Sequence, residues 1–431
     1  MKICMIGTGY VGLVSGACFA DLGNNVWCVD KIKEKIDMLN DGEIPIYEPG
    51  LKELVSKNYD SGRLKFTTNL SFAVRESDLI FICVGTPTSK DGSANLEHVY
   101  KAAKDIASSI NKFKIVINKS TVPVCTGDEV EKIIAKKVKR NNFEVISNPE
   151  FLREGEAIRD FRYPDRIIIG LNNKKIIKKI RDLYDPLIKK GATFFSTNRR
   201  GAEIIKYASN AFLATKISYI NEIGNLCEKS GVDVEQVSLG IGLDKRIGSR
   251  FLRVGPAYGG SCFPKDTKAI AITGNKFNVN LSIIKSVIKS NNDRKKLLTD
   301  RVKKILLNKI KNKKIAFLGV TFKSNTDDMR GSTSLMMIPM LSKKGALINY
   351  YDPTGPKKEF YKLKKVKFYD DIASVCNKAD LVIIHTEWDE FKSIDFNKIV
   401  KKNNFKVFDM RNLYSPNYMK KKGIKYYSIG R

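Results

Sequence analysis

Short apolar stretches alternate with stretches of helical periodicity along residues 1–200. The apolar stretches that predict β-strands lie at 2–6, 25–30, 79–84, 114–118, 144–147 and 166–170. Helical patterns separate most of them. Such alternation is typical of a doubly wound parallel sheet with helices on both faces, so we expect an α/β domain over 1–200.

The pattern changes after residue 200. Apolar positions recur at helical spacing over 201–230, 232–240 and 265–300, and no stretch there predicts a strand. Expected strands resume at 314–318, 347–351, 380–385 and 406–410. The fold class is therefore α/β, with a helical region over 201–300 and a second α/β domain over 301–431.

Composition excludes several classes of protein. The chain has 431 residues, 42% of them hydrophobic, which is a normal globular composition, and no apolar run reaches the length of about 18 residues that a membrane span needs. The apolar N-terminus contains three regularly spaced glycines and Asp21, which favour a mature strand–turn–helix over a signal peptide.

Eight cysteines without a CxxC pair, and only two histidines, predict neither a metal site nor a disulfide framework. We expect reduced core cysteines in a cytoplasmic protein.

The net charge is +31, from 77 Lys and Arg against 46 Asp and Glu. The basic residues are scattered among acidic ones and form no named nucleic-acid motif, so we expect a solvated surface with no nucleic-acid or membrane partner. A basic RNA-binding protein is the alternative, and it would need the charge to form one stripe. Residues 301–431 carry a net charge of +17, which favours an anionic ligand such as a phosphate compound.

A dinucleotide fingerprint, GTGYVG, occupies residues 7–12 between the first expected strand and a helix. Gly7 allows a tight turn, Gly9 lets the backbone approach a pyrophosphate, and Gly12 lets the helix pack closely on the strand. Asp30 ends the second expected strand, where its carboxylate can accept hydrogen bonds from ribose hydroxyls and repel a 2′-phosphate. We therefore expect NAD as the cofactor, in preference to NADP.

Three loops follow other strands of the same sheet. Residues 84–88 and 119–123 are either part of the cofactor site or ordinary turns, and 148–154 brings Glu150 and Glu154 to the carboxyl edge of the sheet. The corresponding loop of the last domain, 319–323, lacks a GxGxxG pattern, so we expect no second dinucleotide there.

Cys262 differs from the other cysteines because it lies in a glycine-rich loop, 255–266, just before a helix. Lys265 and the helix N-terminus would lower the pKa of its thiol, and Asp266 can act as a base. A thiolate can trap an aldehyde as a thiohemiacetal, which gives up a hydride to become a thioester. A cysteine in a flexible loop with no chemical role is the alternative.

Lys206 and Asn210 lie four residues apart on one face of an expected helix, in apolar surroundings. A partly buried lysine can stabilise an alkoxide or move a proton, whereas a lysine that extends to solvent would have no such role. Lys323 and Arg330 follow the first strand of the last domain, either as phosphate ligands or as a solvated basic turn.

Taken together, these segments resemble the UDP-glucose 6-dehydrogenases of the nucleotide-sugar dehydrogenase superfamily, over the whole chain. The segments that carry the resemblance are 119–123, 148–155, the helix with Lys206 and Asn210, 259–266, 322–330 and 409–412. The resemblance implies two Rossmann-like domains, for NAD and for the UDP moiety, joined by a central helical dimerisation region with a long helix. It implies a cytoplasmic homodimer that oxidises UDP-glucose to UDP-glucuronate with two NAD+, for polysaccharide biosynthesis. The closest alternatives are dehydrogenases of UDP-N-acetylmannosamine or GDP-mannose. A more distant alternative is a pseudoenzyme or a regulatory NAD sensor.

The resemblance also implies roles for individual residues. Cys262 would be the nucleophile, Lys206 and Asp266 would move protons and activate water, Asn210 would stabilise the alkoxide, and Thr121 and Glu150 would hold a water. The NAD site would contain Gly7, Gly9, Tyr10, Val11, Gly12, Asp30, Lys35, Thr86, Thr121, Glu154, Lys265 and Arg330. The sugar-nucleotide site would contain Glu150, Phe151, Leu152, Arg153, Glu154, Lys206, Asn210, Phe251, Leu252, Arg253, Val254, Gly255, Tyr258, Gly259 and Lys323.

Three positions depart from the family's usual residues. Cys125 and Ala257 stand where glycine is common, and Thr321 stands where alanine is frequent. Each replacement is small, and Cys125 adds a second thiol to a loop of the expected NAD domain.

Overall fold

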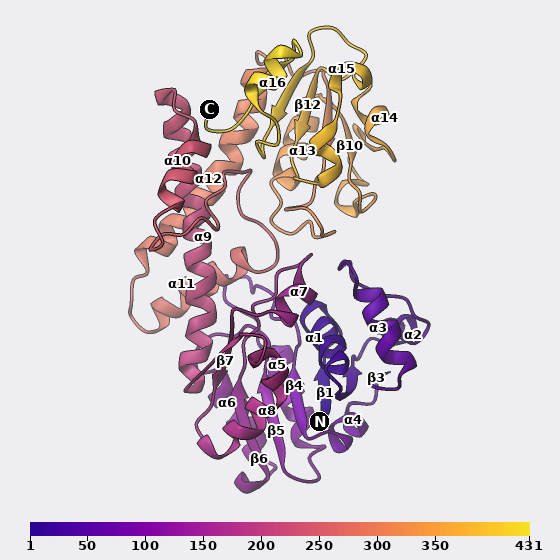
Figure 1. The fold of residues 1–431 in the computed structure, drawn as a ribbon, viewed down its shortest axis with the longest axis vertical. Coiled ribbons are helices and arrows are strands. Elements are labelled where there is room, and N and C mark those ends of the chain that lie inside the picture. The colour runs from indigo at the N-terminus through magenta and orange to yellow at the C-terminus, as the bar shows by residue number, and fades with distance from the viewer. The chain divides into compact units, whose positions relative to one another are not determined.

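The computed structural model describes residues 1–431 and divides into two compact units (Figure 1). One unit contains residues 1–209 and 272–279, and the other contains 210–271 and 280–431. The division falls within two helices, α9 (Arg199–Ser230) and α11 (Phe263–Lys276). The 32-residue α9 is the long helix that the resemblance implied.

The first unit contains an eight-stranded sheet of order β3-β2-β1-β4-β5-β6-β7-β8. Its strands are β1 (Lys2–Ile6), β2 (Asn25–Val29), β3 (Leu64–Thr67), β4 (Leu79–Ile82), β5 (Lys114–Asn118), β6 (Phe143–Ser147), β7 (Arg166–Gly170) and β8 (Thr193–Thr197). All neighbours pair in parallel except β6 and β7, which meet in antiparallel register at Ser147 and Gly170. The six predicted strands are confirmed, whereas β3 and β8, at the edges, were missed.

The second unit contains a six-stranded, fully parallel sheet of order β11-β10-β9-β12-β13-β14. Its strands are β9 (Lys314–Leu318), β10 (Leu347–Tyr351), β11 (Val366–Phe368), β12 (Leu381–Ile384), β13 (Lys406–Asp409) and β14 (Lys425–Tyr427). The central strand β12 is buried along its whole length, as expected for a parallel strand covered on both faces. The four predicted strands are present, and the two three-residue edge strands were missed.

Helices connect the strands of both sheets. Those of the first unit are α1 (Tyr10–Asp21), α2 (Lys33–Asn40), α3 (Leu51–Asp60), α4 (Leu70–Glu76), α5 (Glu97–Ala107), α6 (Thr126–Ala135), α7 (Ala157–Arg162) and α8 (Ile177–Ile188). Those of the second are α10 (Val234–Gly242), α12 (Ser282–Ile305), α13 (Ser334–Lys343), α14 (Ile372–Cys376), α15 (Phe396–Ile399) and α16 (Pro416–Lys421). The helical pattern over 265–300 is broken between α11 and α12. None of the helices combines the length and apolar character that a membrane span requires.

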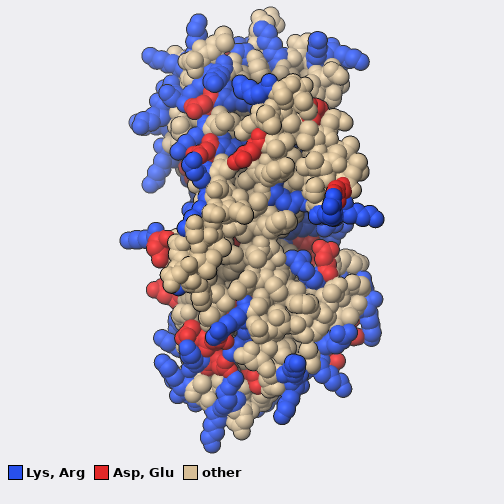
Figure 2. All heavy atoms as spheres, turned by 90° about the vertical axis from the view of Figure 1, so that its left-hand side faces the viewer, with Lys and Arg blue, Asp and Glu red and all other residues tan.

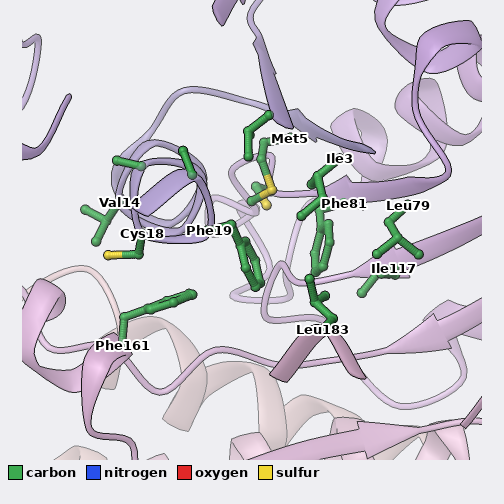
Figure 3. Packing of buried hydrophobic residues seen from close by; sticks show 14 of the residues in the cluster. Ile3, Met5, Val14, Cys18, Phe19, Leu79, Phe81, Ile117, Phe161 and Leu183 are labelled. Carbon is green, nitrogen blue, oxygen red and sulfur yellow. The ribbon is translucent and has the colours of Figure 1, made fainter. Parts of the chain in front are cut away.

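The core of the first unit forms where α1 packs on the sheet (Figure 3). Phe19 of α1 lies against Phe81 and Phe161, with ring centroids 5.3 and 5.0 Å away. The helix can approach the sheet this closely because Gly12 and Gly16 have no side chains. A Cβ at Gly12 would lie 1.8 Å from the Gly7 carbonyl oxygen, and one at Gly16 would lie 2.6 Å from the Cys28 sulfur. The predicted packing role of the third fingerprint glycine therefore has a direct steric cause.

Candidate active site

The glycine-rich turn and Asp30 meet at the carboxyl edge of the first sheet. Gly7 has φ 103°, and a Cβ there would contact the Cys83 carbonyl oxygen, while Gly9, just before α1, has open space where a Cβ would be. Asp30 Oδ2 accepts hydrogen bonds from the Thr8 amide at 3.0 Å and the Thr8 hydroxyl at 2.9 Å. Burial acts to raise the pKa of Asp30, but these hydrogen bonds, one from the Ile32 amide and the charge of Lys35 lower it overall. An ionised acceptor therefore lies where the fingerprint predicts the ribose.

The loops after β4 and β5 contact each other at the same edge. The Thr86 hydroxyl donates to the Thr121 carbonyl oxygen at 3.0 Å, and the Ser120 hydroxyl donates to that of Val84 at 2.7 Å. The Gly7 backbone lies against Cys83 and Val84. The two loops that sequence left as either cofactor site or ordinary turn are thus assembled beside the glycine-rich turn.

The loop after β6 is fixed by two groups from distant parts of the chain. The Gly155 amide donates to the Tyr10 hydroxyl and to Glu48 Oε2, both at 2.6 Å, and Ala157 donates to Glu48 Oε1 at 2.7 Å. Tyr10 was predicted, whereas Glu48 was missed because no motif surrounds it. The exposed Arg153 pairs with Asp160 at 2.6 Å, within the same segment.

Lys206, Glu150 and Phe151 are brought together in the first unit. Lys206 Nζ lies 3.7 Å from Glu150 Oε1 and 4.8 Å from the centroid of the Phe151 ring, and the Lys206 and Glu150 side chains are each only 5% exposed. A lysine that extends to solvent is therefore excluded. Lys119, the first residue of the 119–123 loop, was not among the predicted site residues. It is buried, and its Nζ donates to Asn148 Oδ1 at 3.2 Å. Burial lowers its pKa.

Cys262, Asp266 and Asn210 form a second group, in the other unit. Cys262 immediately precedes α11, and its carbonyl oxygen accepts the Asp266 amide at 2.8 Å. The buried Asp266 carboxylate accepts from the Asn210 side-chain amide at 2.6 Å and from Lys265 Nζ at 2.5 Å. The predicted base is thus held by two of the predicted residues and lies one helical turn after the predicted nucleophile.

The glycine pair before Cys262 allows a close contact with the loop after β9. A Cβ at Gly259 would lie 2.9 Å from both the Gly331 carbonyl oxygen and Phe322 Cβ, and one at Gly260 would lie 2.8 Å from the Phe322 ring. The Gly260 amide, at φ 80°, donates to the Arg330 carbonyl oxygen at 2.7 Å. Two segments that carry the resemblance, 259–266 and 322–330, therefore pack directly on each other.

The remaining substrate-loop residues are held by α12. The Arg294 Nε donates to the Gly255 carbonyl oxygen at 2.7 Å, and the Asn291 side chain bonds both backbone groups of Tyr258, at 2.9 and 3.1 Å. Asn291 and Arg294 were missed, since a polar residue in a helical pattern normally indicates a solvent-facing position. Leu252 and Val254 are buried in the hydrophobic core, so they can offer a ligand only their backbone groups.

The basic residues after β9 are anchored by their own loop. Arg330 makes a two-pronged ion pair with Asp328, with Nη2 and Oδ2 2.8 Å apart, and Lys323 Nζ lies 5.7 Å from the Phe322 ring centroid. The Val320 amide donates to the buried Asp352 carboxylate at 2.9 Å. This hydrogen bond joins the loop after β9 to the residue that follows β10.

The three unusual positions fall in distinct environments. Cys125 has φ 75° and Ala257 has φ 150°, in the backbone region that glycine adopts without strain. This explains physically why glycine suits both positions. Thr321 has an ordinary backbone and is buried, and its hydroxyl donates to the Lys323 carbonyl oxygen at 3.0 Å.

Comparison with known proteins gives a consistent result along the chain. Three models of the UDP-glucose/GDP-mannose dehydrogenase family match, the NAD binding domain at residues 1–188, the central domain at 200–293 and the UDP binding domain at 316–416. The chain is 47% identical to a UDP-glucose 6-dehydrogenase of Rhizobium meliloti, over 100% of both chains. It is 45% identical to one of Bacillus subtilis, over 100% of this chain and 93% of that one.

Solved structures show the same likeness. A UDP-glucose dehydrogenase from Pyrobaculum islandicum superposes with a TM-score of 0.91 at 35% identity, covering 99% of this chain and 96% of that one. A UDP-D-ManNAc dehydrogenase from Pyrococcus horikoshii gives a TM-score of 0.88 at 26% identity, covering 100% and 99%.

Proposed function

The chain belongs to the UDP-glucose/GDP-mannose dehydrogenase family and is an NAD-dependent oxidoreductase, and from this premise we propose that it is a UDP-glucose 6-dehydrogenase. The reaction takes UDP-glucose, two NAD+ and water to UDP-glucuronate, two NADH and three protons. The observation that carries the proposal is the buried Asp266 carboxylate, held by Asn210 and Lys265 one turn after Cys262. A nucleophile beside an assembled base is what a double oxidation through a covalent intermediate needs.

The first unit fits NAD. The glycine-rich turn leaves open backbone at Gly9 for a pyrophosphate, and a Cβ at Gly7 or Gly12 would fill the turn. Asp30 offers an ionised acceptor to ribose hydroxyls and would repel the 2′-phosphate of NADP. When bound, NAD+ accepts a hydride in each of the two oxidations.

We assign the chemical steps to the chain's own residues as the resemblance implies. Lys206 takes the proton of the substrate's C6 hydroxyl in the first oxidation. The Cys262 thiolate, favoured by the α11 N-terminus, then adds to the aldehyde carbon and forms a C–S bond. Asn210 stabilises the oxygen of this thiohemiacetal, which becomes a thioester in the second oxidation. Water that loses its proton to Asp266 displaces the thiolate and releases the carboxylate.

The other predicted residues contribute binding. We propose that Thr121 and Glu150 hold the water, and that the remaining residues of the two predicted sets contact NAD or the nucleotide sugar. The proposed three parts, 1–200 for NAD, 201–300 for dimerisation and 301–431 for the UDP-sugar, are supported by the three family models, which match in that order. The thiols of Cys4, Cys28, Cys83 and Cys376 are buried and form no disulfide, which fits the reducing cytoplasm, where we propose that the enzyme acts.

A second copy of the chain is the proposed partner. Phe212, Tyr219 and Leu226 repeat every seven residues on α9 with exposed fractions of 65%, 52% and 63%, and Leu239 and Leu243 of α10 are also exposed. The face drawn in Figure 2 has a broad area without charged side chains, and its basic residues are scattered instead of forming one stripe. The scatter argues against RNA binding, and the apolar row supports a dimer. Light scattering of Tyr219→Asp should show a monomer if this row is the interface.

The activity is tested by the NADH formed from limiting UDP-glucose with excess NAD+. Two NADH per UDP-glucose would establish the double oxidation. One NADH would mean that the reaction stops at the aldehyde and would exclude the thioester step. No NADH from UDP-glucose, with NADH from UDP-N-acetylmannosamine or GDP-mannose, would replace the proposed substrate by another nucleotide sugar of the same family.

A further inference from the structure

A small cavity in the first unit lies where β5 and β6 end, beside Lys206. The polar side chains of Asn118, Ser120, Ser147, Glu203 and Lys206 line it. Asn118 and Ser147 are the paired last residues of the two strands, and Glu203 and Lys206 lie one turn apart on α9. The ends of β5 and β6 and one turn of α9 therefore contribute polar side chains to the same cavity.

The side-chain amide of Asn118 indicates that the cavity contains a bound water. Its side chain is 1% exposed, yet neither its amide oxygen nor its amide nitrogen has a hydrogen-bond partner in the protein. Leaving such groups unpaired costs about 1–3 kcal/mol each, so a buried amide of this kind calls for a bound water. The cavity has room for roughly one water molecule, and its walls supply the two to four polar partners that a buried water needs.

Glu203 also lines the cavity, and its carboxylate can accept a further hydrogen bond. Its Oε1 accepts from the Gly127 amide at 2.8 Å and the Ser147 hydroxyl at 2.9 Å, and its Oε2 accepts from the Cys125 amide at 2.8 Å. A carboxylate has about four acceptor positions, so one more bond from a water can be accommodated.

Burial raises the pKa of Glu203 to about 7, although the three hydrogen bonds act in the opposite direction. Asp128 on α6 is close enough for its charge to act on the pKa of Glu203. The charge of Glu203 in turn acts on the pKa values of Tyr100 on α5 and Arg200 on α9. Lys206 shares the cavity. Asp128 raises the pKa further, so Glu203 can exchange a proton near neutral pH.

We infer that the cavity holds a water bound by Asn118, and that this water transfers protons between the amine of Lys206 and the carboxylate of Glu203. The inference rests on the proposed function, in which each turnover releases three protons while Lys206 can hold only one. The Lys206 ammonium gives a proton to the water, and the water gives another to Glu203. Lys206 returns to the neutral amine and Glu203 becomes the neutral acid. Glu203 is thus a positioning residue that acts through Lys206.

The test is the pH profile of kcat with saturating UDP-glucose and NAD+. Glu203 must be ionised to accept a proton, so kcat of the unaltered enzyme should rise with pH through about 7. Glu203→Gln keeps the shape and cannot take the proton, and Asn118→Leu removes the partner of the water at similar volume. Both should lose this ionisation and lower kcat about tenfold, less than the loss of a direct acid–base group, with both KM values unchanged. The matched control is Asn349→Leu, at a buried asparagine of β10 whose amide nitrogen also lacks a partner.

Two results would overturn the inference. One is a Glu203→Gln enzyme that keeps the ionisation near pH 7. The other is a fall in kcat accompanied by higher KM values, which would show that Glu203 only holds the start of α6 in place. If Glu203→Gln does not fold, Asn118→Leu decides alone.

A high-resolution crystal structure of the unaltered protein tests the water independently of activity. Density within hydrogen-bond distance of the Asn118 amide supports the inference, and a dry cavity refutes it. If UDP-glucose yields no NADH, the proposed function fails first, and the pH profiles are measured with the nucleotide sugar that the enzyme does oxidise.

Discussion

The side-chain amide of Asn210 donates a 2.6 Å hydrogen bond to Oδ2 of Asp266, joining α9 to the first turn of α11. Asp266 is fully buried, and its other oxygen accepts from Lys265. A buried carboxylate with both oxygens engaged is fixed in orientation, which is what a base needs to meet a proton at a set position.

Asp266→Asn should lower kcat by roughly 10²- to 10⁴-fold, the range for a lost general acid–base group, because the amide keeps the shape but cannot accept a proton. The measurement is steady-state NADH formation, with circular dichroism to show that the fold is retained. Asp380→Asn, which removes a carboxylate that lies just before β12 and pairs with Lys313 and Lys402, is the control and should leave kcat unchanged. Equal losses in both variants would contradict the assignment.

Cys262→Ala should abolish formation of UDP-glucuronate and leave NAD+ binding intact, because the C–S bond cannot form while the first unit is unaltered. Product analysis by chromatography and NAD+ binding by calorimetry check the two halves of this prediction. Cys376→Ala, which removes a buried thiol of the second unit, is the control for loss of a sulfur atom. Turnover in Cys262→Ala would remove the covalent mechanism.

Sequence predicted the elements whose signal is local. Buried strands show as apolar runs, and the fingerprint is contiguous, so β1, β2 and the turn between β1 and α1 were placed correctly. The edge strand β3 was missed because it has only four residues. The edge strand β8 was missed because its sequence, TFFST, is largely exposed and its two apolar residues are adjacent instead of alternating. These two strands form by pairing with a neighbouring strand, and the local sequence does not show that pairing.

The residues that support the site were missed for the same reason. Glu48 bonds the backbone of residues more than a hundred positions away, and Arg294 bonds that of Gly255 from α12. Neither contact leaves a local pattern. Glu203 lies in the same helical turn as the predicted Lys206, but its partners belong to the start of α6 and the end of β6. The reacting groups therefore remain predictions from sequence, and the structure shows which side chains hold the loops around them.

Asp30→Ala should weaken NAD+ binding about 10- to 100-fold, which corresponds to the loss of hydrogen bonds to a charged acceptor worth about 1.5–3 kcal/mol. The affinity for UDP-glucose should change much less, because Asp30 follows β2 in the first unit and bonds Thr8 of the glycine-rich turn. Calorimetric titration of each ligand measures both. Asp37→Ala, which removes an exposed pair with Lys33 on α2, should leave NAD+ affinity unchanged. An equal loss for both ligands would show that the ribose contact is misplaced.

Cys125→Gly should raise the free energy of unfolding by about 1 kcal/mol, because a residue with a Cβ is strained at φ 75° and glycine is not. Urea denaturation at pH 7 measures the change. Lys136→Gly, eleven residues on and in ordinary helical geometry, should instead destabilise by about 0.5–1 kcal/mol. A loss of stability at both positions would mean that the Cys125 thiol contributes more than the strain costs.

His385 should make stability depend on pH. It is fully buried beside β12, with Nδ1 3.1 Å from the Thr386 hydroxyl, and burial together with the charge of Arg411 lowers its pKa from 6.5 to about 3. Below pH 6.5 His385 binds a proton in the unfolded chain but stays neutral in the folded chain. The free energy of unfolding therefore decreases as the pH falls from 6.5 towards 3. The slope is about 1.4 kcal/mol per pH unit, or about 2 kcal/mol at pH 5.

His385→Gln should therefore lose less stability than the unaltered protein between pH 7 and pH 5, measured by urea denaturation at each pH. His98→Gln, on the surface of α5, is the control, and a His385→Gln protein with the unaltered pH dependence would contradict the prediction.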